Sequence, residues 1–269
     1  MKRSLVFMGI TLAVCSLVHA QDATGDRVVV PARNSTRPRK VDVSLMHGSI
    51  AVKTYAGKEV IVETRNSGSR RDGSPATVDG LRRLDLPTRG LSVEEEDNVV
   101  TVRMHSNSSG EVVISVPADT SLKLHSMHGD IAVDGVHGEI DANNLNGKVT
   151  LNNVSGSVVA HSLNGALKVS MDSVDQSKPL SFSTLNGSID VTLPADFKGN
   201  VKLSADRGEI YSDFDFKLTG SPLVTQKNDT ADGKFRVRVD RTMTGTINGG
   251  GTEATFKTYN GKIFIRKKK

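Results

Sequence analysis

The chain has 269 residues, of which 4% are aromatic and none is tryptophan, and its formal net charge is +5. An apolar content of 36% with so few aromatic rings favours a thin core of Val, Ile, Leu and Ala over a large compact globule. Most of the excess positive charge lies in the first three and last four residues. The body is therefore close to neutral, which argues against a nucleic-acid-binding domain.

Residues 1–20 have the features of a secretory signal peptide. Two basic residues precede an apolar run, and Val18-His19-Ala20 forms the cleavage site. The run is too short to cross a membrane as a helix. Cleavage after Ala20 predicts an exported protein, periplasmic or at the cell surface, without a cysteine in the mature chain, because Cys15 is the only one. An envelope lipoprotein anchored through Cys15 is an alternative, although Val14 stands where a lipoprotein signal needs a small residue.

The mature chain divides into three parts. Residues 21–40 are mostly polar and are expected to form an N-terminal arm or linker. Residues 41–265 are expected to form a single β-repeat domain, most regular over 126–212. Residues 266–269 form a basic tail, which the sequence places at the end of the domain.

Glycines recur every nine residues in the most regular part of the chain, from Gly129 to Gly165. Apolar or small residues stand two before each glycine and two and four after it. These offsets share one parity, so we expect all of them to face inward from extended strands. The glycines expected at structural turns are Gly48, Gly129, Gly138, Gly147, Gly156, Gly165, Gly187, Gly208 and Gly261.

Alternate units differ, so the true repeat is two units, or 18 residues. Val133, Leu151 and Val169 follow one set of glycines, whereas Ala142 and Ala160 follow the other. A coil with two unlike sides explains this alternation. We therefore predict an all-β, single-domain β-solenoid with about 18 residues per two-strand coil. An antiparallel meander remains open, because Asn-Gly between alternating apolar residues is also a hairpin signal.

The Leu-Asn-Gly-x-Ile/Val-x-Val units, with their Gly-Asp-Ile-x-Val variants, resemble a family of exported bacterial proteins grouped as candidate adhesins with a domain of unknown function. The resemblance covers roughly 41–265 and is strongest over 126–212. It implies a stacked β-repeat fold and an adhesin-like role. It names no binding residues, because its motif is a structural repeat.

Few residues carry recognisable chemistry. A calcium-binding nonapeptide repeat is excluded, because the residue two after each glycine is apolar where that repeat needs aspartate. A stacked column would bring His128 and His137 together, but turn residues on a solvent edge are the simpler interpretation. Asn146, Asn164 and Asn186 share one repeat position and are expected to form a side-chain ladder. No metal site and no cofactor are predicted.

The sequence therefore predicts a non-enzymatic envelope protein, an adhesin-like or scaffold module that binds through a repetitive β surface. Its partner is an envelope or surface polymer or protein that the sequence does not identify. A polysaccharide-active lyase or hydrolase on the same fold is the alternative, since such enzymes need converging carboxylates in a groove. The acids that cluster in sequence are Asp119, Asp130, Asp134, Glu139 and Asp141.

Overall fold

The computed structural model describes residues 26–33, 37–65, 77–78, 81–82, 90–104, 110–219, 224–229, 234–239 and 242–269. The expected signal peptide, Cys15 and most of the loop at 66–87 lie outside these ranges. The regular elements within them are all strands. None of the described residues belongs to a helix with the length and apolarity needed to cross a membrane.

The strands follow one another closely along the chain. They are β1 (Arg27–Val30), β2 (Lys40–His47), β3 (Ser49–Thr54), β4 (Val60–Arg65), β5 (Thr77–Val78), β6 (Leu81–Arg82), β7 (Leu91–Glu96), β8 (Val99–Met104), β9 (Glu111–Val116), β10 (Ser121–His128), β11 (Ile131–Asp134), β12 (Ile140–Asn146), β13 (Val149–Gly156), β14 (Val158–Asn164), β15 (Leu167–Val174), β16 (Leu180–Asn186), β17 (Ile189–Leu193), β18 (Gly199–Arg207), β19 (Ile210–Ser212), β20 (Phe216–Leu218), β21 (Val224–Asp229), β22 (Lys234–Val239), β23 (Thr242–Ile247), β24 (Thr252–Asn260) and β25 (Ile263–Lys267).

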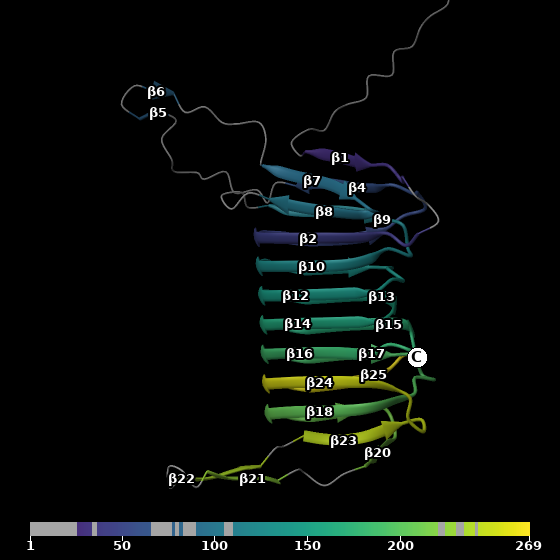
Figure 1. Ribbon diagram of the computed structural model, residues 1–269, viewed down its shortest axis with the longest axis vertical. Coiled ribbons are helices and arrows are strands. Elements are labelled where there is room, and N and C mark those ends of the chain that lie inside the picture. Colours follow the sequence, from purple (N-terminus) through teal and green to yellow (C-terminus); the bar gives the residue numbers. More distant parts are fainter. Residues whose placement is uncertain are drawn as a thin grey trace, which may run out of the picture.

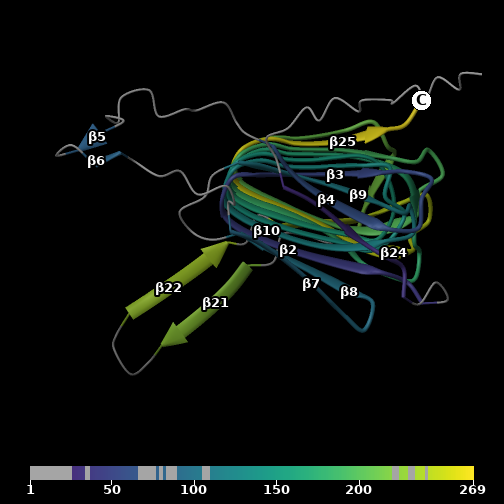
Figure 2. The same cartoon turned by 90° about the horizontal axis from the view of Figure 1, so that it is seen from above.

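Two large sheets face each other and enclose the core (Figures 1 and 2). Sheet A has the order β1-β4-β9-β3-β11-β13-β15-β17-β25-β19. Sheet B has the order β20-β23-β18-β24-β16-β14-β12-β10-β2-β8-β7. Each coil contributes one strand to sheet B and the next strand to sheet A, and consecutive coils pair in parallel. The predicted β-solenoid is confirmed, and the antiparallel meander is wrong for the regular part of the chain.

The 18-residue coil is visible in the strand register. Leu122 of β10 pairs with Ile140 of β12, which pairs with Val158 of β14. The next step is longer, since Ala160 pairs with Phe182. Alternate apolar residues point between the sheets and form one continuous core. Val149 and Leu151 of β13, for example, have no exposed surface.

We expected the residue two before each repeat glycine to face inward, and this expectation is correct on only one side of the coil. Val136 and Val154, which precede Gly138 and Gly156, are fully buried. On the other side, the equivalent residues lie on the outer face; Met46 and Leu185 are 46% and 42% exposed. The strands of sheet B keep their alternation until they reach the turn. There the residue three before the glycine faces inward instead.

The spatial order of the coils departs from the chain order at both ends. The coil of β2 and β3 lies between the coils of β8–β9 and β10–β11. The last coil, β24 and β25, lies between the coils of β16–β17 and β18–β19 (Figure 1). The expectation that the basic residues 266–269 stand at the end of the stack is therefore wrong. Arg266 and Lys267 belong to β25, an interior strand of sheet A.

Antiparallel strands close both ends of sheet B and one end of sheet A, whose other end is the parallel strand β19. β4 covers β9 and is covered in turn by β1, while β7 covers β8. At the other end β23 covers β18, and β20 covers β23. The reversed strands interrupt the parallel frame of the coils. A further coil would find no matching parallel register on β23 or β20, which limits growth of the stack.

Candidate binding surface

One corner of the solenoid is a continuous column of glycines. A Cβ atom built on Gly165 would lie 1.8 Å from the carbonyl oxygen of Gly147, and one on Gly187 would lie 2.1 Å from that of Gly165. The same contact repeats along the column. Its members are Gly110, Gly48, Gly129, Gly147, Gly165, Gly187, Gly261 and Gly208. The coils approach here too closely for any side chain, so each strand of sheet B turns sharply toward sheet A.

The other two predicted turn glycines lie elsewhere. A Cβ atom on Gly138 would lie 2.4 Å from the carbonyl oxygen of Thr120, and one on Gly156 would lie 3.0 Å from that of Gly138. Gly156 is the last residue of β13. Apart from Gly138 and Gly156, all the predicted turn glycines belong to the column at the first corner. The two-unit repeat thus places alternate glycines at different corners of the coil.

Buried polar side chains hold the glycine column together. The hydroxyl of Thr184 donates to the carbonyl oxygen of Gly165 at 2.9 Å, and the amide Nδ2 of Asn144 donates to that of Gly129 at 2.8 Å. Equivalent hydrogen bonds come from Ser126, Ser162 and Thr258. Each of these residues lies three before a glycine. Sequence reasoning missed them, although a small polar residue recurs at that position.

A column of side-chain amides runs outside the glycines, at the residue directly before Gly147, Gly165, Gly187 and Gly261. The Nδ2 atom of Asn164 donates to Oδ1 of Asn146 at 3.0 Å, and that of Asn186 donates to Oδ1 of Asn164 at 2.8 Å. Asn260 continues the column at 2.8 Å. This is the ladder that the sequence predicts for the first three asparagines. Its fourth member comes from the distant last coil.

Histidines extend the amide column toward the N-terminal coils. Asn146 Nδ2 lies 3.3 Å from Nδ1 of His128, whose ring stacks on that of His47 with centroids 5.1 Å apart. We call the column of His47, His128, Asn146, Asn164, Asn186 and Asn260 the amide ladder. The alternative in which a stacked column brings His128 and His137 together is wrong. His137 belongs to the opposite corner, where its amide nitrogen bonds to the carbonyl oxygen of Ala118.

An apolar row runs beside the amide ladder on the outer face of sheet B. It consists of the residues two before six of the column glycines, namely Met46, Met127, Leu145, Leu163, Leu185 and Tyr259. Tyr259 is 39% exposed, and the guanidinium of Arg207 lies 5.3 Å from its ring centroid. The two columns together make an amphipathic stripe that crosses six coils, polar on one side and apolar on the other.

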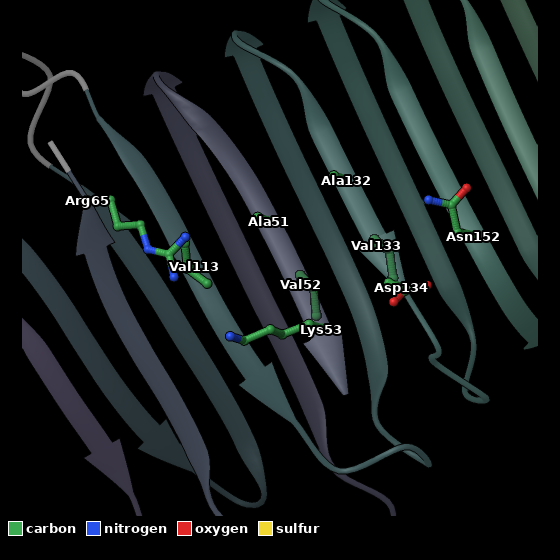
Figure 3. A pocket seen from close by; sticks show the side chains of 9 residues that line it. All are labelled: Ala51, Val52, Lys53, Arg65, Val113, Ala132, Val133, Asp134 and Asn152. Atoms are coloured by element: carbon green, nitrogen blue, oxygen red, sulfur yellow. The ribbon is translucent and has the colours of Figure 1, made fainter. Parts of the chain in front are cut away.

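The outer face of sheet A carries a shallow hollow of about 230 Å³ (Figure 3). Its floor is made of small side chains, Ala51 and Ala132 with Val113 beside them, and Lys53 and Arg65 lie at its border (Figure 3). Arg65 approaches Glu111 only at 4.0 Å. The hollow exists because alanines on two adjacent strands are flanked by longer side chains.

The acids that the enzyme alternative requires do not converge. Glu139 pairs with Lys178 at 2.6 Å, Asp130 accepts a hydrogen bond from the backbone of Lys148, and Asp141 accepts one from Asn143. Only Asp134 borders the hollow. No three His, Cys, Asp or Glu side chains among the described residues are placed to share a metal ion.

A charged and aromatic cluster occupies the far end of the same face. Tyr211 stacks on Phe264 with centroids 5.2 Å apart. The carboxylate of Glu209 accepts a hydrogen bond from the Tyr211 hydroxyl at 2.6 Å and pairs with Lys262 at 2.9 Å. The bond from Tyr211, and then the bond and charge of Lys262, lower the pKa of Glu209 from its ordinary value. The cluster joins β19 to the last coil.

Most of the chain is matched by a family of known sequences. The Toastrack DUF4097 family matches residues 28–248. The chain belongs to this family. The Toastrack match begins within β1 and ends directly after β23, so the coil of β24 and β25 lies outside the matched residues.

Solved structures with remote similarity have also been found, and comparison with curated proteins gives no match. A candidate cell adhesion protein from Clostridium sporogenes is 12% identical, with 91% of this Toastrack chain and 99% of that chain covered and a TM-score of 0.47. A candidate adhesin from Bacteroides fragilis is 11% identical, with 91% and 96% covered and a TM-score of 0.39.

Proposed function

We propose that this protein is an exported, non-enzymatic module of the bacterial envelope that binds an extended polymer along the amphipathic stripe of sheet B. Export follows from the signal peptide expected over 1–20. The mature chain then begins at Gln21, and β1 of the expected arm and Arg266 and Lys267 of the expected basic tail are paired into sheet A with the repeat domain. The observation that carries the proposal is the continuity of the amide ladder and the apolar row.

The spacing of the stripe favours a polymer over a small molecule. Neighbouring strands lie about 4.8 Å apart, so the six coils from Met46 to Tyr259 present equivalent groups over roughly 24 Å. A linear polysaccharide offers both hydroxyl groups and apolar C–H faces in a regular repeat. The amides would hydrogen-bond the hydroxyls, while the Leu and Met side chains would cover the C–H faces. Such a surface needs no converging catalytic groups.

A binding experiment tests this stripe against the opposite face. The probes are insoluble peptidoglycan sacculi and a panel of neutral and acidic polysaccharides, assayed by co-sedimentation and affinity electrophoresis. Leu163→Asp combined with Leu185→Asp places charges in the apolar row and is expected to abolish binding. Thr150→Asp combined with Thr192→Asp places the same charges on the outer face of sheet A and is expected to leave binding intact.

The outcomes separate the functions. Binding that survives the change in the apolar row but is lost with the control would move the site to sheet A, and loss in both would remove the argument for the stripe. Release of new reducing ends or unsaturated sugars from any probe would favour the polysaccharide-active enzyme instead. Fractionation of cells that produce the full chain tests export.

A further inference from the structure

The last coil of the chain fills a slot in the middle of the stack. β24 pairs in parallel with β16 on one side and with β18 on the other. β25 pairs in the same way with β17 and β19. The chain reaches this slot only after it has built the coil beyond it and the closing strands β20 and β23. The slot is therefore filled by the segment that follows β23, and residues 248–251 join this segment to the rest of the stack.

The slot is matched to its occupant by shape. The hydroxyl of Thr258 donates to the carbonyl oxygen of Gly187, and Asn260 donates to Asn186 of the amide ladder. A Cβ on Gly261 would lie 1.8 Å from the carbonyl oxygen of Gly187. Phe256 stacks on Phe182 of the coil before it, at 5.1 Å. The last coil thus has the same contacts as the coils that are adjacent in sequence.

The slot is also matched by charge. The occupant supplies basic side chains, and the neighbouring coils supply acidic ones. Arg266 binds Asp190 at 2.8 Å, Lys262 binds Glu209 at 2.9 Å, and Lys268 binds Asp172. Asp190 lies on β17 and Glu209 directly precedes β19, the two strands that flank β25, whereas Asp172 lies on β15, one strand further away. These exposed pairs favour a basic occupant over another coil of this chain.

A short hinge connects the occupant to the rest of the molecule. Residues 248–251 carry the chain across the end of β18, from β23 on one side to β24 on the other. Asn248, Gly249 and Gly250 have φ angles of 49°, 89° and 87°, a left-handed run that glycine tolerates. A connection of this kind, tight and at the junction of a separable element, is where copies of a chain exchange identical segments.

We propose that the coil of residues 252–267 is an exchangeable element, and that the slot of one copy accepts the same coil from a second copy. The exchanged assembly keeps every contact described above, because donor and recipient have identical sequences. Only the hinge differs between the closed monomer and the exchanged form. This inference rests on the topology of the stack and not on the proposed function.

The length of the hinge decides which form is possible. Ile247 and Thr252 flank Gly199 on opposite sides of β18, so they lie roughly 10 Å apart, two strand spacings. Deletion of residues 248–251 joins them directly, at about 3.8 Å between Cα atoms. The coil then cannot reach its own slot. It remains free to enter the slot of another copy.

The experiment compares a shortened hinge with a lengthened one in the full chain. The variant without residues 248–251 is expected to double its mass in light scattering, with the strand content of the wild type by circular dichroism. A matched control with Gly-Ser-Gly-Ser inserted after Gly250 keeps its reach and is expected to stay monomeric. A shortened variant that is folded and monomeric would overturn the proposal.

A second arm decides the case in which the shortened variant aggregates. Thr192 and Arg266 are registered neighbours across the slot. Thr192→Cys and Arg266→Cys are made in separate copies with Cys15→Ser and an unchanged hinge, then refolded together. Exchange predicts a disulfide between copies on a non-reducing gel. Thr192→Cys mixed with Ser181→Cys on sheet B is the control and should give none. Absence of the 192–266 disulfide, or an equal yield in the control, would sink the proposal.

Discussion

The hydroxyl of Ser162 donates a hydrogen bond to the carbonyl oxygen of Gly147, 3.3 Å away in the preceding coil. The serine is fully buried, and a Cβ atom on Gly147 would lie 2.3 Å from the carbonyl oxygen of Gly129. One coil thus supplies a close backbone approach, and the next supplies the polar group that bonds across it. The corner of the solenoid is stabilised by both features together.

Removal of one of these buried donors should lower stability without changing the shape of the core. Thr184→Val keeps the branched side chain but loses the bond to Gly165, at a cost of about 1 kcal/mol. Thr150→Val, on the outer face, is the matched control and should change little. Chemical denaturation of both variants measures the difference. Equal stabilities would mean that the buried hydroxyl contributes nothing.

Valine at the glycine column should destabilise the chain by more than about 1 kcal/mol. In Gly165→Val the new Cβ meets the carbonyl oxygen of Gly147 at 1.8 Å, and in Gly147→Val a φ of 147° adds strain to the clash. Ala132→Val on the outer face of sheet A adds similar volume in open surroundings. Thermal melting should separate the two sites. Glycine-column variants with the same melting temperature as Ala132→Val would contradict the close approach of the coils.

Leu151→Ala should cost about 2–5 kcal/mol, because the side chain is fully buried between the sheets. Lys148→Ala should change stability by less than about 0.5 kcal/mol, because Lys148 is exposed at the turn. Urea denaturation of the two variants compares inward and outward positions within one strand region. A large loss of stability in Lys148→Ala would mean that the aliphatic part of the lysine side chain packs against the domain.

Acid should loosen the attachment of β19 to the last coil. The pKa of Glu209 is lowered in the folded protein, mainly by the Tyr211 hydroxyl and then by Lys262. Its stabilising effect is therefore complete above the ordinary value of 4.5 and is lost as the pH falls through the lower folded value. Hydrogen exchange of β25 amides should rise over that window. Glu209→Gln should remove this part of the pH dependence, and an unchanged profile would contradict the assignment.

The regular repeat made much of the fold predictable. Nine-residue glycine spacing and its two-unit alternation follow from a coil with two corners, and both are present. The ladder of Asn146, Asn164 and Asn186 was also predictable, because parallel coils in register stack identical positions. The residues two before the glycines, such as Leu185, were assigned to the wrong face on the sheet B side. The prediction assumed that inward and outward residues alternate without interruption through the glycine. In sheet B this alternation stops at the turn, before the glycine.

The order of the coils was not predictable from the pattern. Leu203 of β18 and Phe256 of β24 stand at equivalent inward positions, and the pattern allows either to pair with Phe182 of β16. The sequence alone does not indicate which of the two strands lies next to β16. The pairing of His47 with His128 was hidden for a related reason, because 81 residues separate them and a different coil intervenes in the chain. Identical repeats specify how coils stack but not which coils are neighbours.

The interior place of the last coil has a consequence for synthesis. A chain that leaves the ribosome or crosses a membrane from its N-terminus has both neighbours of the slot before it has the segment that fills it. The contact of Asn260 with Asn186 closes 74 residues, whereas that of Asn164 with Asn146 closes 18. This fourfold longer closure costs roughly 1.2 kcal/mol more in chain entropy. The regular coils are expected to form early, and the docking of residues 252–267 then sets the pace of maturation. Premature termination would leave an open gap within the sheets rather than a shorter stack.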